Sequence, residues 1–330
     1  MEVLVFGAGS LGSLLGARLA SAHDVTLVGR DPHVRAVRES GLTVEGVESF
    51  VARPAAVTDL GDIGGVRGGG GGDEGGDRAD QSVDGADSGG RRVDLAVVTV
   101  KTFDTVGAAE ALAAADLEAD AVVSLQNGMG NEETLAARLA VPVVAGTTTV
   151  GARLAAPGRV AWLGRGETTV GPWTDDADDA ADLVAAAFDA AGIPCERVST
   201  TAVERVLWEK LAVNAAINPV TALARVANGA VIEPPLADAA RAAAAETARV
   251  ARSRGVALDP DAAVDRAIGV ARRTAENRSS MHQDVAAGRR TEVDSINGYV
   301  VDRAPADESV PANTVLAGLV RGWERGQGLR

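Results

Sequence analysis

Three glycines near the start of the chain have the spacing of a dinucleotide-binding loop. Gly7, Gly9 and Gly12 lie between an apolar run, residues 2–6, and a helical segment, residues 14–20. In such loops the first glycine permits a tight turn, the second lets the backbone approach a pyrophosphate, and the third allows close packing of the helix. Amide groups at the start of the helix attract the anion. The motif therefore predicts a dinucleotide site, with a purely structural glycine turn as the alternative.

The end of the next apolar run favours one of the two nicotinamide cofactors. Residues 25–28 are followed by Gly29 and Arg30, where a cofactor without a 2′-phosphate is usually met by an Asp or a Glu. A guanidinium fork suits a phosphate dianion, so Arg30 predicts NADPH rather than NADH. Asp31 follows immediately, and a solvated surface arginine is the alternative interpretation of Arg30.

Two polar side chains follow further apolar runs. Lys101 comes directly after residues 95–100, and Asn127 follows residues 121–125. Ligands of open α/β folds bind beside the carboxyl ends of the strands, so we expect these two side chains in one crevice. Taken singly, each is a plausible loop residue, but together they outline a site.

A further polar group lies on a helix later in the chain. Lys210, Asn214 and Asn218 recur every four residues, which places them on one helical face. Asparagine is a poor residue for a helix interior, so its repetition beside a lysine in an apolar stretch needs an explanation. The spacing leaves two: a ligand-facing row, or an exposed polar stripe. The small polar residues at 275–284 and 290–299 likewise have two interpretations, a ligand site or helix capping.

The elements that must position these side chains alternate between strand and helix in the first half of the chain. Further strands are expected at residues 42–44, 95–100, 121–125 and 143–146, and helices at residues 105–115 and 132–139. This alternation predicts an α/β fold with a Rossmann-type, parallel, doubly wound sheet. Residues 61–92 are rich in glycine and poor in large apolar residues, which predicts a flexible insertion. A phosphate cradle is the alternative there, but no strand and helix frame the segment.

After about residue 200 the sequence becomes rich in alanine and nearly free of strand signals. Helices are expected at residues 202–224, 236–254, 262–276, 292–303 and 312–324. Pro219 should end or kink the first of them. The chain is therefore predicted to have two domains: a cofactor-binding domain at residues 1–200 and an all-α domain for substrate and catalysis at residues 201–330.

Composition excludes several classes of function. The 330 residues include 46 acidic and 32 basic side chains, a formal net charge of −14, which argues against nucleic acid and anionic membranes as partners. The single cysteine, Cys195, rules out an internal disulfide, and we expect it to be a small buried apolar residue. The histidines, His23, His33 and His282, are too far apart for a zinc motif, so no metal is predicted. Residues 3–20 lack the basic segment of a signal peptide, so a cytoplasmic protein is expected.

The basic residues are unevenly divided between the two types. Lys101 and Lys210 are the only lysines, and the remaining basic residues are arginines. An acidic chain with almost no lysine is typical of proteins from salt-loving organisms, with an ordinary acidic protein from a GC-rich genome as the alternative. Both interpretations concern solubility and not fold.

Taken together, these segments resemble the ketopantoate reductase (2-dehydropantoate 2-reductase) family. The glycine motif is shared by many dehydrogenases, whereas the later segments are more specific. The matching segments, in family order, are residues 7–12, 126–130, 146–149, 208–211 with Asn214 and Asn218, 276–281 and 291–299. The resemblance implies a Rossmann-type domain and a helical domain with NADPH and substrate in the cleft between them. It also implies reduction of 2-dehydropantoate to (R)-pantoate, on the route to pantothenate and coenzyme A.

The resemblance further implies roles for individual residues. Lys210 falls on the catalytic lysine, the general acid that protonates the carbonyl oxygen as hydride arrives at carbon two, and Glu292 on a glutamate near cofactor and substrate. The positions implied to hold substrate are Asn127, Asn214, Asn218, Asn228 and Ser280. The positions implied to contact the cofactor are Gly7, Ala8, Gly9, Ser10, Leu11, Gly12, Arg30, Lys101, Asn127, Ala152 and Glu292.

Two features depart from the family pattern. The insertion at residues 61–92 precedes Lys101, which puts the details of that loop in doubt, and Val150 replaces a histidine often found after the Gly-Thr-Thr-Thr run. Two other functions stay open: a related NADPH-dependent reductase of another branched 2-oxo acid, and an NADPH-binding sensor without catalysis. The expected partner is a small-molecule substrate, without nucleic acid or membrane, and a homodimer is allowed.

Overall fold

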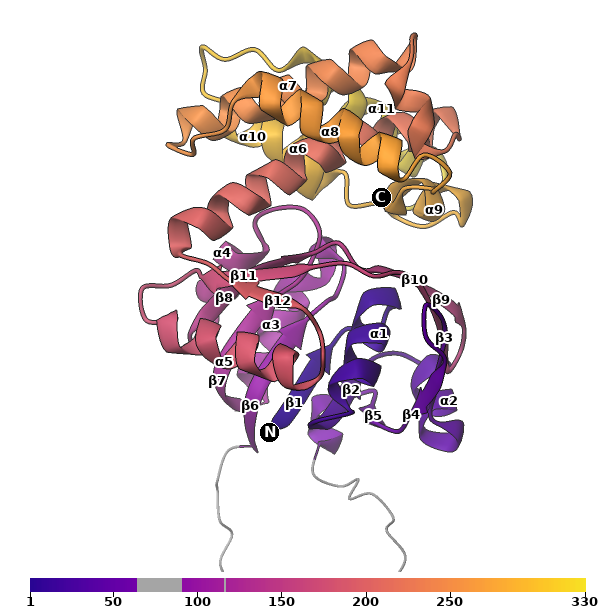
Figure 1. Cartoon of the computed structure of the whole chain (residues 1–330), viewed down its shortest axis with the longest axis vertical. Helices are drawn as coiled ribbons and strands as arrows, with labels where there is room; N and C mark the ends of the chain where they lie inside the picture. Colours follow the sequence, from indigo (N-terminus) through magenta and orange to yellow (C-terminus); the bar gives the residue numbers. More distant parts are fainter. Residues whose placement is uncertain (64–90, 116) are drawn as a thin grey trace, which may run out of the picture.

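The computed structural model describes residues 1–63, 91–115 and 117–330. Figure 1 shows a sheet flanked by helices and, above it, a group of helices that covers one end of the sheet layer. The long helix α6 (Thr200–Ala224) leads from the first part into the second. The prediction of a Rossmann-type α/β domain followed by an all-α domain is confirmed.

The main sheet has eight strands in the order β12-β11-β8-β7-β6-β1-β2-β5. Neighbouring strands are parallel except β11 and β8, which are antiparallel. The strands are β1 (Glu2–Phe6), β2 (Asp24–Val28), β5 (Ala55–Val57), β6 (Arg91–Val98), β7 (Leu117–Ser124), β8 (Val143–Thr148), β11 (Thr168–Pro172) and β12 (Cys195–Arg197).

The central strands contain continuous apolar runs because helices cover both faces of the sheet. In β1, Leu4 and Val5 are both fully buried, and they belong to hydrophobic clusters on opposite faces. Such continuous apolar runs are typical of parallel strands. The helices around the sheet are α1 (Ser10–Leu19), α2 (His33–Ser40), η1 (Leu60–Asp62), η2 (Thr102–Asp104), α3 (Thr105–Ala114), α4 (Asn131–Ala136) and α5 (Asp178–Ala190).

A second, smaller sheet corrects one expectation. The strand expected at residues 42–44 does not join the doubly wound sheet, because it pairs with a hairpin more than a hundred residues later in the chain. This sheet packs against α1 through all four of its strands. Its strands, in the order β4-β3-β10-β9, are β3 (Leu42–Gly46), β4 (Phe50–Ala52), β9 (Gly151–Ala156) and β10 (Arg159–Gly164).

The ends of the predicted insertion are regular structure. Gly61 and Asp62 belong to η1, and Arg91 and Arg92 begin β6, where the backbone pairs with the first residues of β7. The flexibility expected for residues 61–92 otherwise concerns residues 64–90, which lie outside the described residues. Cys195 lies in β12 and is half-buried against the core rather than enclosed by it.

The second part of the chain is built around α6. Its alanine-rich surface packs against α7, α8 and α9, with small buried side chains that let the helices approach closely. The elements are η3 (Asn228–Ile232), α7 (Leu236–Ser253), α8 (Pro260–Arg273), α9 (Ser280–Ala286), η4 (Asp294–Gly298), α10 (Tyr299–Arg303) and α11 (Pro311–Gly326). In the described part of the chain, no helix is both long and apolar enough to cross a bilayer.

Two helix predictions need correction in detail. Of the two effects expected of Pro219, an end of the helix is wrong, because α6 continues to Ala224. Proline has no N–H for the carbonyl of Ala215 one turn earlier, and the side-chain amide of Asn297 donates to that carbonyl instead, at 3.1 Å. The helix expected at residues 292–303 begins two residues later as the π-helical turn η4 and becomes regular only in α10.

Candidate active site

The glycine loop has the geometry that its sequence predicts. Gly7 adopts φ of +115°, which disfavours any residue with a side chain, and its carbonyl accepts a hydrogen bond from the Thr99 hydroxyl at 2.9 Å. A Cβ on Gly12 would collide with that same carbonyl group. A Cβ on Gly9 would meet no atom within 4 Å, so the space in front of the loop is open. The loop therefore fits a pyrophosphate at the N-terminus of α1.

Arg30 and Ala152 lie on either side of this loop. Arg30 follows β2, its side chain is 87% exposed, and it contacts the carboxylate of Asp104 at 3.2 Å. Ala152 lies in β9, and two residues further on the Leu154 amide donates to the Ser10 hydroxyl at 2.9 Å. An exposed guanidinium beside the loop is free to turn toward a phosphate of a bound dinucleotide.

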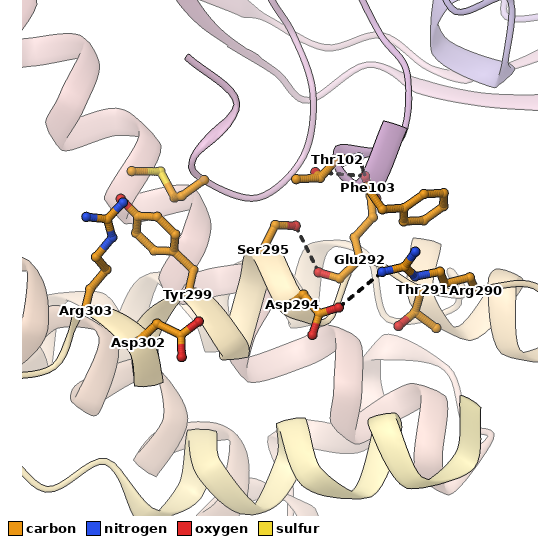
Figure 2. Close-up of a pocket in the computed structure, with 11 residues that line it drawn as sticks. Thr102, Phe103, Arg290, Thr291, Glu292, Asp294, Ser295, Tyr299, Asp302 and Arg303 are labelled. Carbon is orange, nitrogen blue, oxygen red and sulfur yellow. Dashed lines mark hydrogen bonds and ion pairs between the residues drawn. The ribbon is translucent and has the colours of Figure 1, made fainter. Parts of the chain in front are cut away.

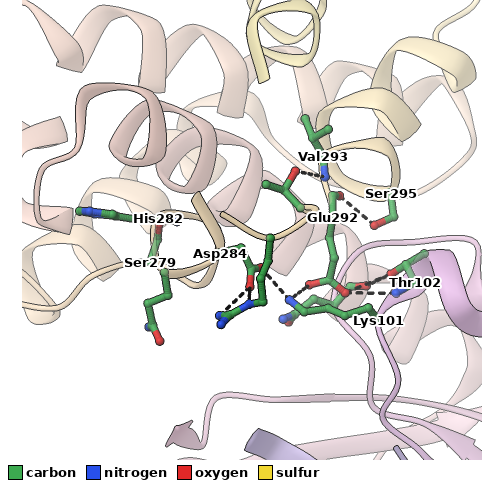
Figure 3. Close-up of polar contacts among 12 residues, drawn as sticks. Lys101, Thr102, Ser279, His282, Asp284, Glu292, Val293 and Ser295 are labelled. Carbon is green, nitrogen blue, oxygen red and sulfur yellow. Dashed lines mark hydrogen bonds and ion pairs between the residues drawn. The ribbon is translucent and has the colours of Figure 1, made fainter. Parts of the chain in front are cut away.

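Lys101 joins the two parts of the molecule (Figure 3). Its ammonium donates to Asp284 Oδ2 at 2.9 Å and to Glu292 Oε2 at 3.0 Å, both from the helical part. The other oxygen of Glu292 accepts from the Thr102 amide at 3.2 Å. Burial alone would lower the pKa of Lys101, but Glu292 and Asp284 outweigh it and raise that pKa. Sequence reasoning placed Lys101 toward cofactor phosphates and did not single out Asp284, which is buried.

Lys210 has different surroundings. It lies on α6, and its ammonium donates to the Thr148 carbonyl at the end of β8, at 3.0 Å. Burial lowers the pKa of Lys210 to about 8, against the opposing effect of the Glu292 and Glu132 carboxylates. The ion pairs of the described residues include none with Lys210. An ammonium with this pKa, and with donors beyond its one protein hydrogen bond, can act as a general acid near neutral pH.

The remaining predicted substrate positions divide between two places. Asn214 and Asn218 continue the face of α6 that carries Lys210, and Asn218 is buried. Asn228 lies apart, at the start of η3, where its side-chain amide donates to the Thr274 hydroxyl at 3.0 Å. Its Oδ1 is buried without a protein partner, which is the arrangement expected of a group that awaits a ligand or water.

Asn127 and Ser280 come from the two different parts of the chain. The Asn127 carbonyl accepts from the Thr102 hydroxyl at 2.8 Å, which ties the loop after β7 to the loop after β6. Ser280 is half-buried in the first turn of α9, a helix capped by the Ser279 side chain. In the described part of the chain, no hydrogen bond links Asn228 or Ser280 to Lys210.

A pocket of about 500 Å³ lies between η2 and the segment that leads into α10 (Figure 2). Of the predicted site residues, Glu292 alone lines it. On its walls, the guanidinium of Arg290 stacks over Phe103 at 4.6 Å and that of Arg303 over Tyr299 at 4.9 Å. Glu292 thus lies on the pocket wall and also contacts Lys101.

The chain matches known proteins over both of its parts. The family profile described as "Ketopantoate reductase PanE/ApbA" matches residues 3–175, and the one described as "Ketopantoate reductase PanE/ApbA C terminal" matches residues 202–324. The chain belongs to the ketopantoate reductase family.

Relatives in this family align over nearly the whole chain. A 2-dehydropantoate 2-reductase of Halobacterium salinarum is 42% identical over 97% of this chain and 98% of its own length, and one of Archaeoglobus fulgidus is 38% identical over 98% of both. A ketopantoate reductase structure from Ralstonia eutropha has a TM-score of 0.82 at 32% identity, covering 99% of this chain and 100% of that one. A D-mandelate dehydrogenase structure with NADH has a TM-score of 0.85 at 21% identity, covering 100% of both chains, and so shows the shared fold.

Family membership leaves some functional residues unassigned by sequence. Asp284 and Glu132 are both buried carboxylates near the lysines, and neither was predicted. Glu132 follows the Gln-Asn-Gly-Met-Gly segment by two residues, so a charged pair directly after that segment was the available signal.

Proposed function

We propose that the chain is an oxidoreductase that reduces 2-dehydropantoate to (R)-pantoate with NADPH. The observation that carries the proposal is the half-buried ammonium of Lys210, whose pKa is lowered to about 8 and which lies between the sheet edge and the helical part. Names of relatives aligned over almost the whole chain support the same reaction.

The nicotinamide cofactor supplies the hydride to carbon two of the substrate. The glycine loop and the start of α1 would hold its pyrophosphate, and Arg30 would contact its 2′-phosphate. As charge develops on the substrate oxygen, the Lys210 ammonium stabilises that charge and donates a proton to the oxygen.

Neutral donors complete the site. Asn127, Asn214, Asn218, Asn228 and Ser280 orient the hydroxyl and carboxylate of the substrate without competing for the proton. Because the cofactor loop belongs to residues 1–200 and Lys210 to residues 201–330, closure of the two domains aligns hydride donor and acceptor. The ion pairs of Lys101 with Asp284 and Glu292 link the same two domains.

The test is a reduction assay with purified protein in concentrated salt, which suits the acidic composition. Oxidation of NADPH on addition of 2-dehydropantoate is expected, with kcat/KM at least about tenfold above that with NADH. A panel of branched 2-oxo acids, ranked by kcat/KM, distinguishes this substrate from a related one. Tight NADPH binding without oxidation by any panel member would contradict the proposal and support a sensor.

A further inference from the structure

Glu132 is a buried carboxyl group that the proposed mechanism does not use. It is 1% exposed, and its Oε2 has no hydrogen-bond partner in the described structure. Its other polar contacts are with the Ser124 hydroxyl and its own backbone amide. Burying a carboxyl group costs several kcal/mol unless a charge compensates, so a fold has no structural reason to keep one here.

The position of Glu132 is fixed by its neighbours on α4. The preceding residue, Asn131, accepts from the Thr105 hydroxyl at 2.9 Å and donates to the Asn127 carbonyl at 3.2 Å. The following residue, Glu133, turns elsewhere and accepts from the Tyr299 hydroxyl at 3.3 Å. The first turn of α4 is therefore anchored, and adjacent carboxylates serve different parts of the molecule.

Strand β8 is a shared neighbour of the helices that carry Glu132 and Lys210. Helices α4 and α6 both pack against β8, and Lys210 donates to Thr148 at the end of that strand. Two carboxylates act on the Lys210 ammonium: Glu292 has the larger effect and Glu132 the smaller. Glu292 is also shared with Lys101 at 3.0 Å, whereas Glu132 is in no ion pair of the described residues.

We infer that Glu132 is a positioning residue that acts through Lys210: its buried carboxylate keeps the ammonium charged until the proton is transferred. This inference rests on the proposed role of Lys210 as the proton donor. Glu292 is expected to touch cofactor and substrate, but Glu132 acts on the reaction through the lysine.

The direction of the effect follows from the charges around the pair. Burial, aided by the charge of Glu133, raises the pKa of Glu132 to about 7, against hydrogen bonds from its own backbone amide and Ser124 and the charge of Lys210. Near pH 8 Glu132 is therefore mostly ionised and stabilises the charged form of Lys210. Removing this carboxylate leaves burial and Glu292 as the main influences on Lys210, so its pKa must fall.

The two lysines make this shift directly measurable. Protein labelled with ¹³C at its lysine ε-carbons gives one NMR signal from Lys101 and one from Lys210, and Lys101→Arg assigns them. In Glu132→Gln we expect the pKa of Lys210 to fall by roughly 0.5 to 1 unit, and that of Lys101 to stay unchanged. The alkaline limb of the kcat profile should move by the same amount, while KM for 2-dehydropantoate changes less than about twofold.

Glu133→Gln is the matched control because it removes the same charge one residue away. It should leave the NMR titration of Lys210 and the pH profile of kcat unchanged. An unshifted Lys210 in folded Glu132→Gln would overturn the inference. If that variant does not fold, Glu132→Asp replaces it: a charge withdrawn by one carbon should lower the pKa of Lys210 by a smaller amount, and no change would again overturn the inference.

The two proposals fail in different ways. A protein that shows the NMR shift but reduces no 2-oxo acid contradicts the proposed function and supports the charge coupling. A protein that reduces 2-dehydropantoate, with Lys210 unshifted in Glu132→Gln, contradicts this inference alone.

Discussion

The surroundings of Lys101 and Lys210 show how one side chain acquires two chemical characters. Lys101 contacts two carboxylates at 2.9 and 3.0 Å, and its pKa is raised. Lys210 donates to one carbonyl and lies beyond ion-pair distance of Glu292 and Glu132. Its pKa is lowered to about 8. Contact with carboxylates makes an ammonium a fixed link, and distance from them makes it a proton donor.

Exchanging each lysine for arginine should give the largest contrast. Lys210→Arg is expected to lower kcat at least about 100-fold, because a guanidinium does not release its proton near neutral pH. Lys101→Arg can still pair with Asp284 and Glu292, so its kcat should stay within about threefold of the original. Steady-state kinetics measures both, and NADPH binding by fluorescence checks that each variant is loaded. Equal losses of kcat in the two variants would contradict the assignment of Lys210 as proton donor and Lys101 as structural link.

The pH dependence of activity sharpens the same contrast. A general acid must be protonated, so kcat should fall as pH rises through about 8, the pKa of Lys210, by about tenfold per unit beyond it. Lys101→Arg should keep this alkaline limb. If Lys101→Arg shifts the alkaline limb, Lys101 rather than Lys210 is the group that titrates.

Removing one carboxylate from Lys101 tests its structural role. Asp284→Asn keeps the shape of the side chain but loses the charge that contacts Lys101 and Arg289. The free energy of unfolding should fall by about 1–3 kcal/mol, since Glu292 still pairs with Lys101. Thermal unfolding at fixed salt measures this, with Asp302→Asn as an exposed control. An equal loss in the control would point to net charge rather than the link.

The sequence predicts those features that depend on neighbours along the chain. Apolar runs locate the central strands, and the glycine spacing locates the cofactor loop. The strand at residues 42–44 was misplaced because its partner, β10, lies more than a hundred residues later in the chain, so no local pattern shows the pairing. Pro219 stays within α6 because of Asn297, which also comes from far along the chain.

The site residues show the same difference between local and long-range features. Lys210, Lys101 and Glu292 were identified from motifs, and the structure places Glu292 near both lysines. Asp284 and Glu132 were missed because an acidic residue in an acidic chain carries no sign of burial. Tertiary packing removes these carboxylates from solvent, and that packing is not encoded in any local pattern.

Replacing each lysine with methionine should produce the smallest effects, which are changes in melting temperature of opposite sign. A raised pKa means that the charged form of Lys101 stabilises the fold below its ordinary value of 10.5, so Lys101→Met should lower the melting temperature at pH 7 by roughly 2–4 °C. A lowered pKa means that charged Lys210 costs stability below about 8, so Lys210→Met should raise the melting temperature. The gain should shrink between pH 8 and 10.5, where Lys210 is neutral in the folded chain but charged in the unfolded one. Calorimetry across this range measures both shifts. Two increases would show that burial governs both lysines, and two decreases would show that the carboxylates govern both.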